Sequence, residues 1–142
     1  SCLFIYECLK FYVKRDFLRG THFSITPLAA LLLTWLLINN FDRTYTAVAS
    51  AFLILLLLIQ LIKLKRYMGR FYISYILCLI PFFIVNGLLT SLPVIEYNDA
   101  ANLGIRIGTI PLDDFIYNAA LLLLVTMGYE WSRKKFPMKG AI

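Results

Sequence analysis

Four long apolar blocks, separated by short clusters of basic residues, dominate this chain of 142 residues. Hydrophobic residues make up 61% of the sequence and charged residues 15%, whereas an ordinary soluble domain is about 45 to 50% apolar. The apolar residues run in continuous stretches instead of recurring at a helical or strand period, which is typical of helices that face lipid. The sequence therefore predicts an all-α integral membrane protein.

A helix that crosses the hydrocarbon layer needs about 20 mostly apolar residues. Blocks of this kind occupy residues 21–38, 45–62, 71–89 and 111–131. The opening segment, SCLFIYECLKFYVKR, is also apolar and ends in positive charge, so we interpret it as the last turns of a truncated fifth span. We expect a polytopic transmembrane helix bundle with four near-complete spans and the end of a fifth.

The basic residues lie in alternate connections between these blocks, and the two remaining connections contain one arginine each, Arg43 and Arg106. Because cytoplasmic loops are enriched in Lys and Arg, this alternation predicts a multi-pass topology with a cytoplasmic C-terminus. The three clusters are Lys10, Lys14, Arg15 and Arg19; Lys63, Lys65, Arg66 and Arg70; and Arg133, Lys134, Lys135 and Lys139.

The same distribution argues against nucleic acid as a partner, since the net charge of +6 is divided among separate clusters and forms no continuous basic face. The three cysteines lack a CxxC spacing, and His22 is the only histidine, so no metal site is predicted. No Gly-rich phosphate-binding or dinucleotide-binding motif occurs, and no cofactor is evident.

An internal repeat is visible at the two ends of the chain. Ile5-Tyr6-Glu7 followed by Lys10 resembles Gly128-Tyr129-Glu130 followed by Arg133, although many membrane spans end in tyrosine and basic residues. If the repeat is real, residues 1–20 are the end of a preceding repeat's last helix with a cytoplasmic linker, and residues 21–142 form a second repeat.

Asp113 and Asp114 are the candidates for chemistry, because ionisable residues at membrane depth are costly and tend to be functional. Two adjacent carboxylates do not both ionise readily in a low dielectric, so one would keep a proton, as a general acid requires. The alternative is that acidic residues simply favour a helix N-terminus. Arg106 could pair with either aspartate and oppose the acid role.

Two asparagines add polar groups near this position. Asn118 follows Asp114 by four residues, so the two share a helix face. Asn86 lies deep in the third apolar block, where it either hydrogen-bonds across helices as a structural contact or takes part in a site. Pro81 lies in the same block and predicts a kink.

The stretch PFFIVNGLLTSLPVIEYNDAANLGIRIGTIPLDDFIYN, residues 81–118, resembles the second repeat of bacterial membrane-embedded lycopene cyclases, which consist of two small homologous units, separate or fused. The resemblance is to the fused form found in Bacteroidetes-like bacteria. The signature of that family is Pro-x-Glu followed by Glu or Asp at the start of a transmembrane helix. Here it corresponds to Pro111-Leu112-Asp113-Asp114, in which Asp113 replaces the family's Glu.

The resemblance implies a lycopene β-cyclase type of isomerase in the bacterial inner membrane, acting in carotenoid biosynthesis on lycopene or a related carotenoid. It implies that Asp113 or Asp114 is the acid, and that membrane lipid and the missing N-terminal homologous repeat are partners. Aromatic residues near the motif would stabilise the carbocation by cation–π attraction, unless they are packing or lipid-facing residues. These aromatic residues are Phe82, Phe83, Phe115 and Tyr117.

A second hypothesis is a non-catalytic membrane subunit that binds carotenoid or a partner protein. Replacing Asp113 and Asp114 separates the two hypotheses, because a binding subunit should keep its pigment whereas a cyclase should lose turnover. A small transporter is disfavoured, since it would need polar residues in several spans and this sequence has few.

Overall fold

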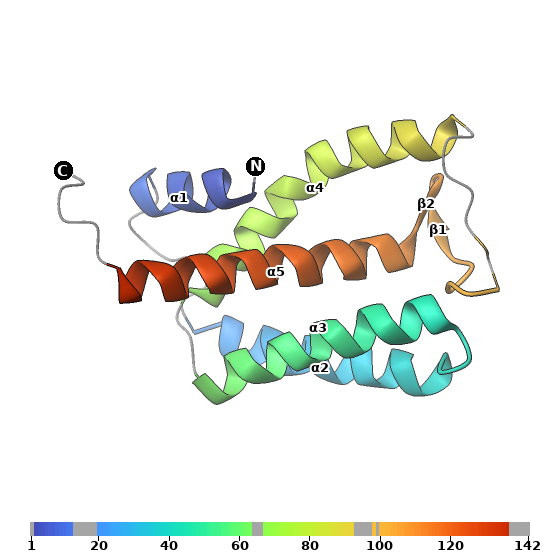
Figure 1. Cartoon of the computed structure of the whole chain (residues 1–142), viewed down its shortest axis with the longest axis horizontal. Helices are drawn as coiled ribbons and strands as arrows, with labels where there is room; N and C mark the ends of the chain where they lie inside the picture. The colour runs from blue at the N-terminus through green and yellow to red at the C-terminus, as the bar shows by residue number, and fades with distance from the viewer. Residues whose placement is uncertain (1, 13–19, 64–66, 93–97, 99, 137–142) are drawn as a thin grey trace.

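The structure, a computed structural model, describes residues 2–12, 20–63, 67–92, 98 and 100–136 (Figure 1). Within these residues the chain forms five helices and two short strands. The helices are α1 (Cys2–Tyr12), α2 (His22–Asn39), α3 (Thr44–Lys63), α4 (Met68–Ser91) and α5 (Leu112–Lys135), and the strands are β1 (Arg106–Ile107) and β2 (Ile110–Pro111). The four long helices are confirmed close to their predicted bounds. The predicted all-α fold class is confirmed, and a small β-hairpin with two residues in each strand is an addition to it.

Three helices, α3, α4 and α5, are long and apolar enough to cross a membrane, whereas α2 contributes a shorter apolar segment, Phe23–Asn39. The predicted count of four near-complete spans and the end of a fifth therefore stays a prediction for α2 and for the 11-residue α1. Large apolar side chains are exposed along these helices, including Trp35 at 65% and Ile84 at 68%. Hydrocarbon around the helices would cover such surfaces, which water would not favour.

Helix α5 lies in the middle of the molecule, with α3 and α2 on one side and α4 and α1 on the other (Figure 1). One face of α3 is buried against its neighbours, and small residues such as Ala49 and Ser50 on this face let helices approach closely. Ala120 provides the same close approach on α5. The core cluster contains Ala30, Leu53, Leu56, Leu57, Met68, Phe71, Ala120 and Leu123.

The helices alternate in direction, so the described basic clusters share one end of the molecule. The end of α3, the start of α4 and the end of α5 lie together there, and they carry Lys63, Arg70 and residues 133–135 (Figure 1). Lys10 belongs to the same end, near the end of α1. The remaining cluster residues, at positions 14, 15, 19, 65, 66 and 139, lie outside the described residues.

The opposite end holds the β-hairpin that leads into α5. Ile107 pairs with Ile110 across a two-residue turn, Gly108-Thr109, in which Gly108 has a φ of 65°. Gly104 also has a positive φ, of 69°, in the approach to β1. A backbone N–H of Leu112 then donates to the carbonyl of Ile105 at 2.9 Å, which joins the first residue of α5 to the hairpin. These glycines shape a tight loop, as their positions in the sequence predict.

Candidate functional site

Asp113 lies in the first turn of α5 and is completely buried. The Thr46 hydroxyl of α3 donates to one carboxylate oxygen, Oδ1, at 2.5 Å. The backbone N–H of Leu103 donates to the other oxygen, Oδ2, at 2.8 Å. Both oxygens are thus occupied by donors from the protein, and Asp113 links the start of α5 to α3 and to the loop before the hairpin.

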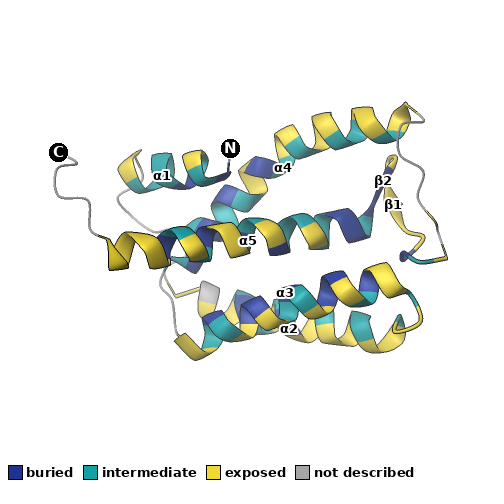
Figure 2. Ribbon diagram, viewed as in Figure 1, coloured by how far each residue is buried: buried dark blue, intermediate teal, exposed yellow. Residues whose placement is uncertain are grey.

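Asp114, the next residue, is also buried, but its carboxylate has different partners. The Tyr45 hydroxyl of α3 lies 3.2 Å from Oδ1, and the Asn86 side-chain amide of α4 donates to Oδ2 at 3.0 Å. Asp114 therefore joins α3, α4 and α5 in the buried segment at the start of α5 that Figure 2 shows in dark blue. The helix dipole favours both aspartates at this position, but it does not explain contacts from two other helices.

A pocket of about 330 Å³, here called the site pocket, lies between α4 and α5. Asn86 lines this pocket and also holds Asp114, so one side chain connects the carboxylate to the cavity. Asn118 lines it as well, and its buried Nδ2 has no hydrogen-bond partner among the described residues. The lining is otherwise mostly apolar: Cys78, Pro81, Phe82, Val85, Asn86, Asn118 and Leu122. It suits an apolar ligand next to a few polar groups.

Helix α4 continues through Pro81, which lines the site pocket. Figure 1 shows the second half of α4 diverging from α5. The diverging half carries Phe82, Val85 and Asn86 of the pocket lining. The course of α4 therefore leaves room for the site pocket between the two helices.

The predicted aromatic residues form two groups. The ring of Phe115 lies 5.1 Å from the rings of both Phe82 and Phe83, measured between centroids. Tyr117 is exposed instead, and its ring lies 6.2 Å from that of Tyr45. Among the four predicted aromatic residues, Phe82 lines the site pocket, whereas Phe83, Phe115 and Tyr117 surround the motif without lining it.

Arg106, the other predicted site residue, lies on β1 with its side chain exposed and is not among the residues that line the site pocket. A different arginine reaches into the loop before the motif. Arg43 donates to the backbone carbonyl of Asn102, and the side chain of Asn102 in turn accepts from the N–H of Gly104. These contacts hold the loop that supplies the Leu103 N–H to Asp113.

Sequence reasoning did not place Tyr45, Thr46 or Tyr75 at the site. The Tyr75 hydroxyl donates to the carbonyl of Phe115 at 2.9 Å and thereby ties α4 to the first turn of α5. The small polar residues of the second apolar block could have indicated Thr46. Thr46 and Ser50 are four residues apart, so they lie on one face of a helix. Nothing in the linear sequence pairs Thr46 with Asp113, 67 positions away.

A second polar cluster joins α1 to the far end of α5. The Tyr6 hydroxyl donates to Glu130 at 2.7 Å, and the Lys10 ammonium contacts both Glu7 and Glu130. Lys10 thus lies between the glutamates of the two Tyr-Glu pairs, and the internal repeat itself stays a prediction.

No group of three or more potential metal-ligating residues occurs in the part of the chain that the structure describes. The polar groups that the site does contain are carboxylates, amides and hydroxyls. A buried carboxyl next to an apolar cavity is suited to exchanging a proton with a ligand bound there.

The family model for lycopene cyclase matches residues 42–132 of this chain. Neither the curated proteins nor the solved structures contain a match. The matched region extends from the connection before α3 into the last part of α5, and it includes every residue that contacts Asp113 or Asp114 in the hydrogen bonds above. Since the match covers more than half of the sequence, the chain belongs to the lycopene cyclase family.

Proposed function

We propose that this protein forms β-rings at the ψ-ends of lycopene by a proton-initiated isomerisation, with Asp114 as the general acid. The observation that carries this assignment is the position of Asn86, which binds the Asp114 carboxylate and lines the site pocket. Asp113 is less suited to the role, because its two partners, Thr46 and the Leu103 N–H, belong to residues that do not line the site pocket. Asp113 acts as a positioning residue that holds the start of α5.

The reaction needs one proton donated and one removed. The acid protonates the terminal C1=C2 double bond of the substrate, which leaves a cation at C1. The C5=C6 bond attacks this cation and closes the six-membered ring, and loss of a ring proton then restores a double bond. The proton gained equals the proton lost, so the product is an isomer and no oxidant or reductant is consumed. A carboxylate that has given up its proton can accept the second one.

The site pocket is the right kind of cavity for one end of such a substrate. Its volume of about 330 Å³ lies at the small end of ligand pockets, which span roughly 300 to 1,000 Å³. A long polyene would place one end group there and lay the rest along exposed apolar side chains of α4 such as Ile84 and Leu88. Phe82 lines the pocket, and a ring in this position stabilises a desolvated cation by up to about 2 kcal/mol.

A homologous unit supplies the family's other acidic motif in this proposal. The contacts of Tyr6 and Lys10 with Glu130 support it, since they bring the two Tyr-Glu pairs of the predicted repeat together. The assembled protein would bring two acidic motifs to one membrane-embedded enzyme.

The test is to replace the two aspartates separately in the complete protein, in cells that accumulate lycopene. Asp114→Asn should lower β-ring formation by roughly 10² to 10⁴, the contribution of an acid–base group, with little loss of protein. Asp113→Asn keeps one acceptor oxygen where the aspartate has two, so it can accept from either Thr46 or the Leu103 N–H and should lower stability by about 1 to 3 kcal/mol.

Product is measured as cyclic carotenoid per amount of membrane-inserted protein, which corrects for losses in folding. Pigment retained by purified Asp114→Asn is measured in parallel, because a non-catalytic binding subunit would keep its pigment and have no turnover to lose. Near-wild-type ring formation by Asp114→Asn would remove Asp114 from the acid role. If Asp113→Asn alone abolished conversion in stable protein, the two roles would be reversed.

A further inference from the structure

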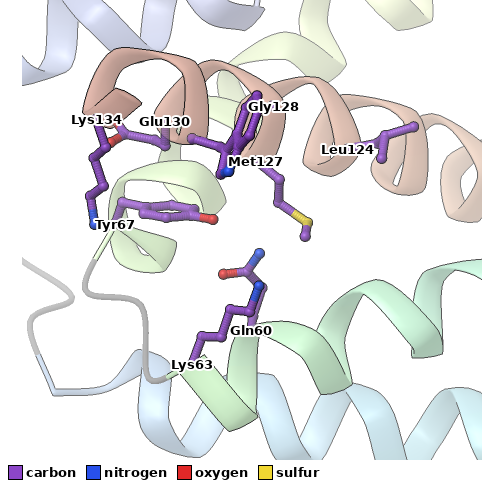
Figure 3. Close-up of a pocket in the computed structure, with 9 residues that line it drawn as sticks. Gln60, Lys63, Tyr67, Leu124, Met127, Gly128, Glu130 and Lys134 are labelled. Carbon is purple, nitrogen blue, oxygen red and sulfur yellow. The ribbon is translucent and has the colours of Figure 1, made fainter. Parts of the chain in front are cut away.

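The end of α5 that lies farthest from the aspartates borders a second cavity, of about 320 Å³, here called the basic-end pocket. Its walls come from the end of α3, the start of α4 and the end of α5 (Figure 3). The lining residues are Gln60, Lys63, Tyr67, Leu124, Met127, Gly128, Glu130, Trp131 and Lys134. Asp114 and Glu130 are 16 residues apart on one helix, or about 24 Å at 1.5 Å per residue, so this pocket is separate from the proposed cyclisation site.

The lining changes character along α5. Leu124 and Met127 give it an apolar wall toward the middle of the helix, whereas Trp131 and Lys134 lie near the helix end. Lys63 lies at the end of α3, and its side chain and that of Lys134 are both exposed. This order, from apolar wall to aromatic ring to cation, matches the boundary between hydrocarbon and headgroups.

A buried hydrogen-bond acceptor in the wall of the pocket is available to a ligand. Gln60 is only 3% exposed, and its Oε1 has no hydrogen-bond partner among the described residues. Figure 3 shows the amide of Gln60 and the hydroxyl end of Tyr67 pointing toward each other across the hollow, with the Met127 side chain directed into the same space. A buried acceptor of this kind is unfavourable unless a donor reaches it.

We propose that the basic-end pocket binds the headgroup of an anionic phospholipid that bears hydroxyl groups. The phosphate lies between Lys63 and Lys134, a headgroup hydroxyl donates to Gln60 Oε1, and an acyl chain follows the wall formed by Leu124 and Met127. Inorganic phosphate shares the charge that the lysines recognise, but it has no apolar part to cover that wall. The site would hold one lipid at the basic end of the bundle, independently of the cyclisation chemistry.

Trp131 provides a reporter, because it lines the pocket and the only other tryptophan, Trp35, lies on α2. The complete protein carrying Trp35→Phe is placed in phosphatidylcholine bilayers containing increasing fractions of phosphatidylglycerol with brominated acyl chains, which quench Trp131 on contact. Quenching should show preferential binding of phosphatidylglycerol over phosphatidylcholine. Replacing Lys63 and Lys134 together by Gln should lower this preference about tenfold or more, since each lysine near an anionic headgroup contributes roughly a factor of five.

A control removes the same charge from the same helix end at two residues outside the pocket lining. The Lys135 ammonium lies 5.0 Å from the centroid of the Trp131 ring, so quenching in each variant is normalised to the Trp131 emission of that variant in phosphatidylcholine alone. Arg133→Gln with Lys135→Gln should change the preference by less than about twofold, because salt screens charges that do not contact the bound headgroup. An equal loss in both double variants would show diffuse attraction to the basic surface and overturn the proposed site. No preference for phosphatidylglycerol in the parent protein would overturn it as well.

Two further arms identify the ligand. Gln60→Leu should weaken quenching by phosphatidylglycerol but not by brominated phosphatidic acid, whose headgroup ends at the phosphate. Equal weakening for both lipids would contradict the role of the Gln60 carbonyl. Inorganic phosphate at millimolar concentration and constant ionic strength should leave quenching unchanged. If phosphate instead reversed the quenching of Trp131, the pocket would be assigned to the free anion and the lipid rejected.

Discussion

Thr46 and Ser50 lie one turn apart on the buried face of α3, and both side chains are completely buried. The Thr46 hydroxyl donates to Asp113, whereas the Ser50 hydroxyl has no hydrogen-bond partner within the described residues. Removing the two hydroxyls therefore has different consequences, although both side chains are buried on the same face of α3. Comparing substitutions at the two positions therefore separates the contribution of one hydrogen bond to stability from that of packing.

We predict that Thr46→Val, which keeps the shape of the side chain, lowers the free energy of unfolding by about 1 to 3 kcal/mol, because one Asp113 oxygen loses its donor in a buried site. Thr46→Ser should restore most of the loss. Ser50→Ala should be within about 0.5 kcal/mol of the parent protein, since no described partner is left unpaired. Thermal unfolding in detergent measures all three variants. Equal destabilisation by Thr46→Val and Ser50→Ala would contradict the importance of the Thr46 contact.

The sequence predicted which residues cluster near the motif better than it predicted which of them touch. The one-face relation of Asp114 and Asn118 follows from helical spacing alone, and Asn118 lies in the site pocket beside Asn86. The contact of Asp114 with Asn86 joins two helices across 28 positions, so it depends on how α4 packs on α5. Helical periodicity carries no information about such a pairing.

Two glycines, one in the hairpin and one in α4, occupy positions with different conformational requirements. Gly108 has a positive φ in the hairpin turn, and a Cβ placed there would meet nothing within 4 Å. Gly87 lies inside α4, where an added Cβ would have Ile110 at an ordinary contact distance of 3.8 Å. The first position needs the conformational freedom of glycine, whereas the second accepts a side chain.

We predict opposite signs for the two alanine substitutions. Gly108→Ala should lower stability by about 1 to 2 kcal/mol, because a residue with a Cβ is strained at a φ of 65°. Gly87→Ala should raise stability by about 0.5 to 1 kcal/mol, since alanine is favoured over glycine in a helix. Melting temperatures of the purified variants give the comparison. A loss at Gly87 larger than that at Gly108 would mean that packing against the hairpin outweighs backbone conformation.

At the level of elements, the long helices were predictable. A chain segment inside hydrocarbon must pair its own backbone N–H and C=O groups, and a long apolar block does this by forming a helix. Their observed bounds differ from the predicted ones by a few residues at the ends, where capping and fraying act. The hairpin was not predictable in the same way. Its strands have two residues each, too few for an alternating pattern, and only Gly104 and Gly108 signalled a tight connection.

The whole molecule has two chemically different ends joined by α5. One end carries the buried aspartates and the hairpin, and the other carries the Tyr6-Glu130 contact, the basic clusters and the basic-end pocket. Between them the exposed side chains are mainly apolar, as on Trp35 and Ile84. A molecule built this way lies across a membrane with one end at each interface, since charged groups avoid the hydrocarbon.

Orientation across the membrane is the last prediction. The basic end, with Lys63, Arg70 and Lys134, should face the cytoplasm, because clustered Lys and Arg residues are retained on that side during insertion. The hairpin should then face outward. Cysteines are introduced singly at Ile107 and Lys134, both exposed, in a background whose three native cysteines are replaced by alanine.

An impermeant thiol reagent should label Ile107→Cys in intact cells and Lys134→Cys only after the membrane is opened. A third variant, Cys78 retained alone, is the negative control, since that side chain is buried. Labelling of Lys134→Cys but not of Ile107→Cys in intact cells would reverse the orientation. Reversal would place the aspartates near the inner leaflet and the basic-end pocket near the outer leaflet. The same labelling experiment therefore also shows which leaflet supplies the proposed lipid. It shows in addition from which side of the membrane the acid exchanges its proton.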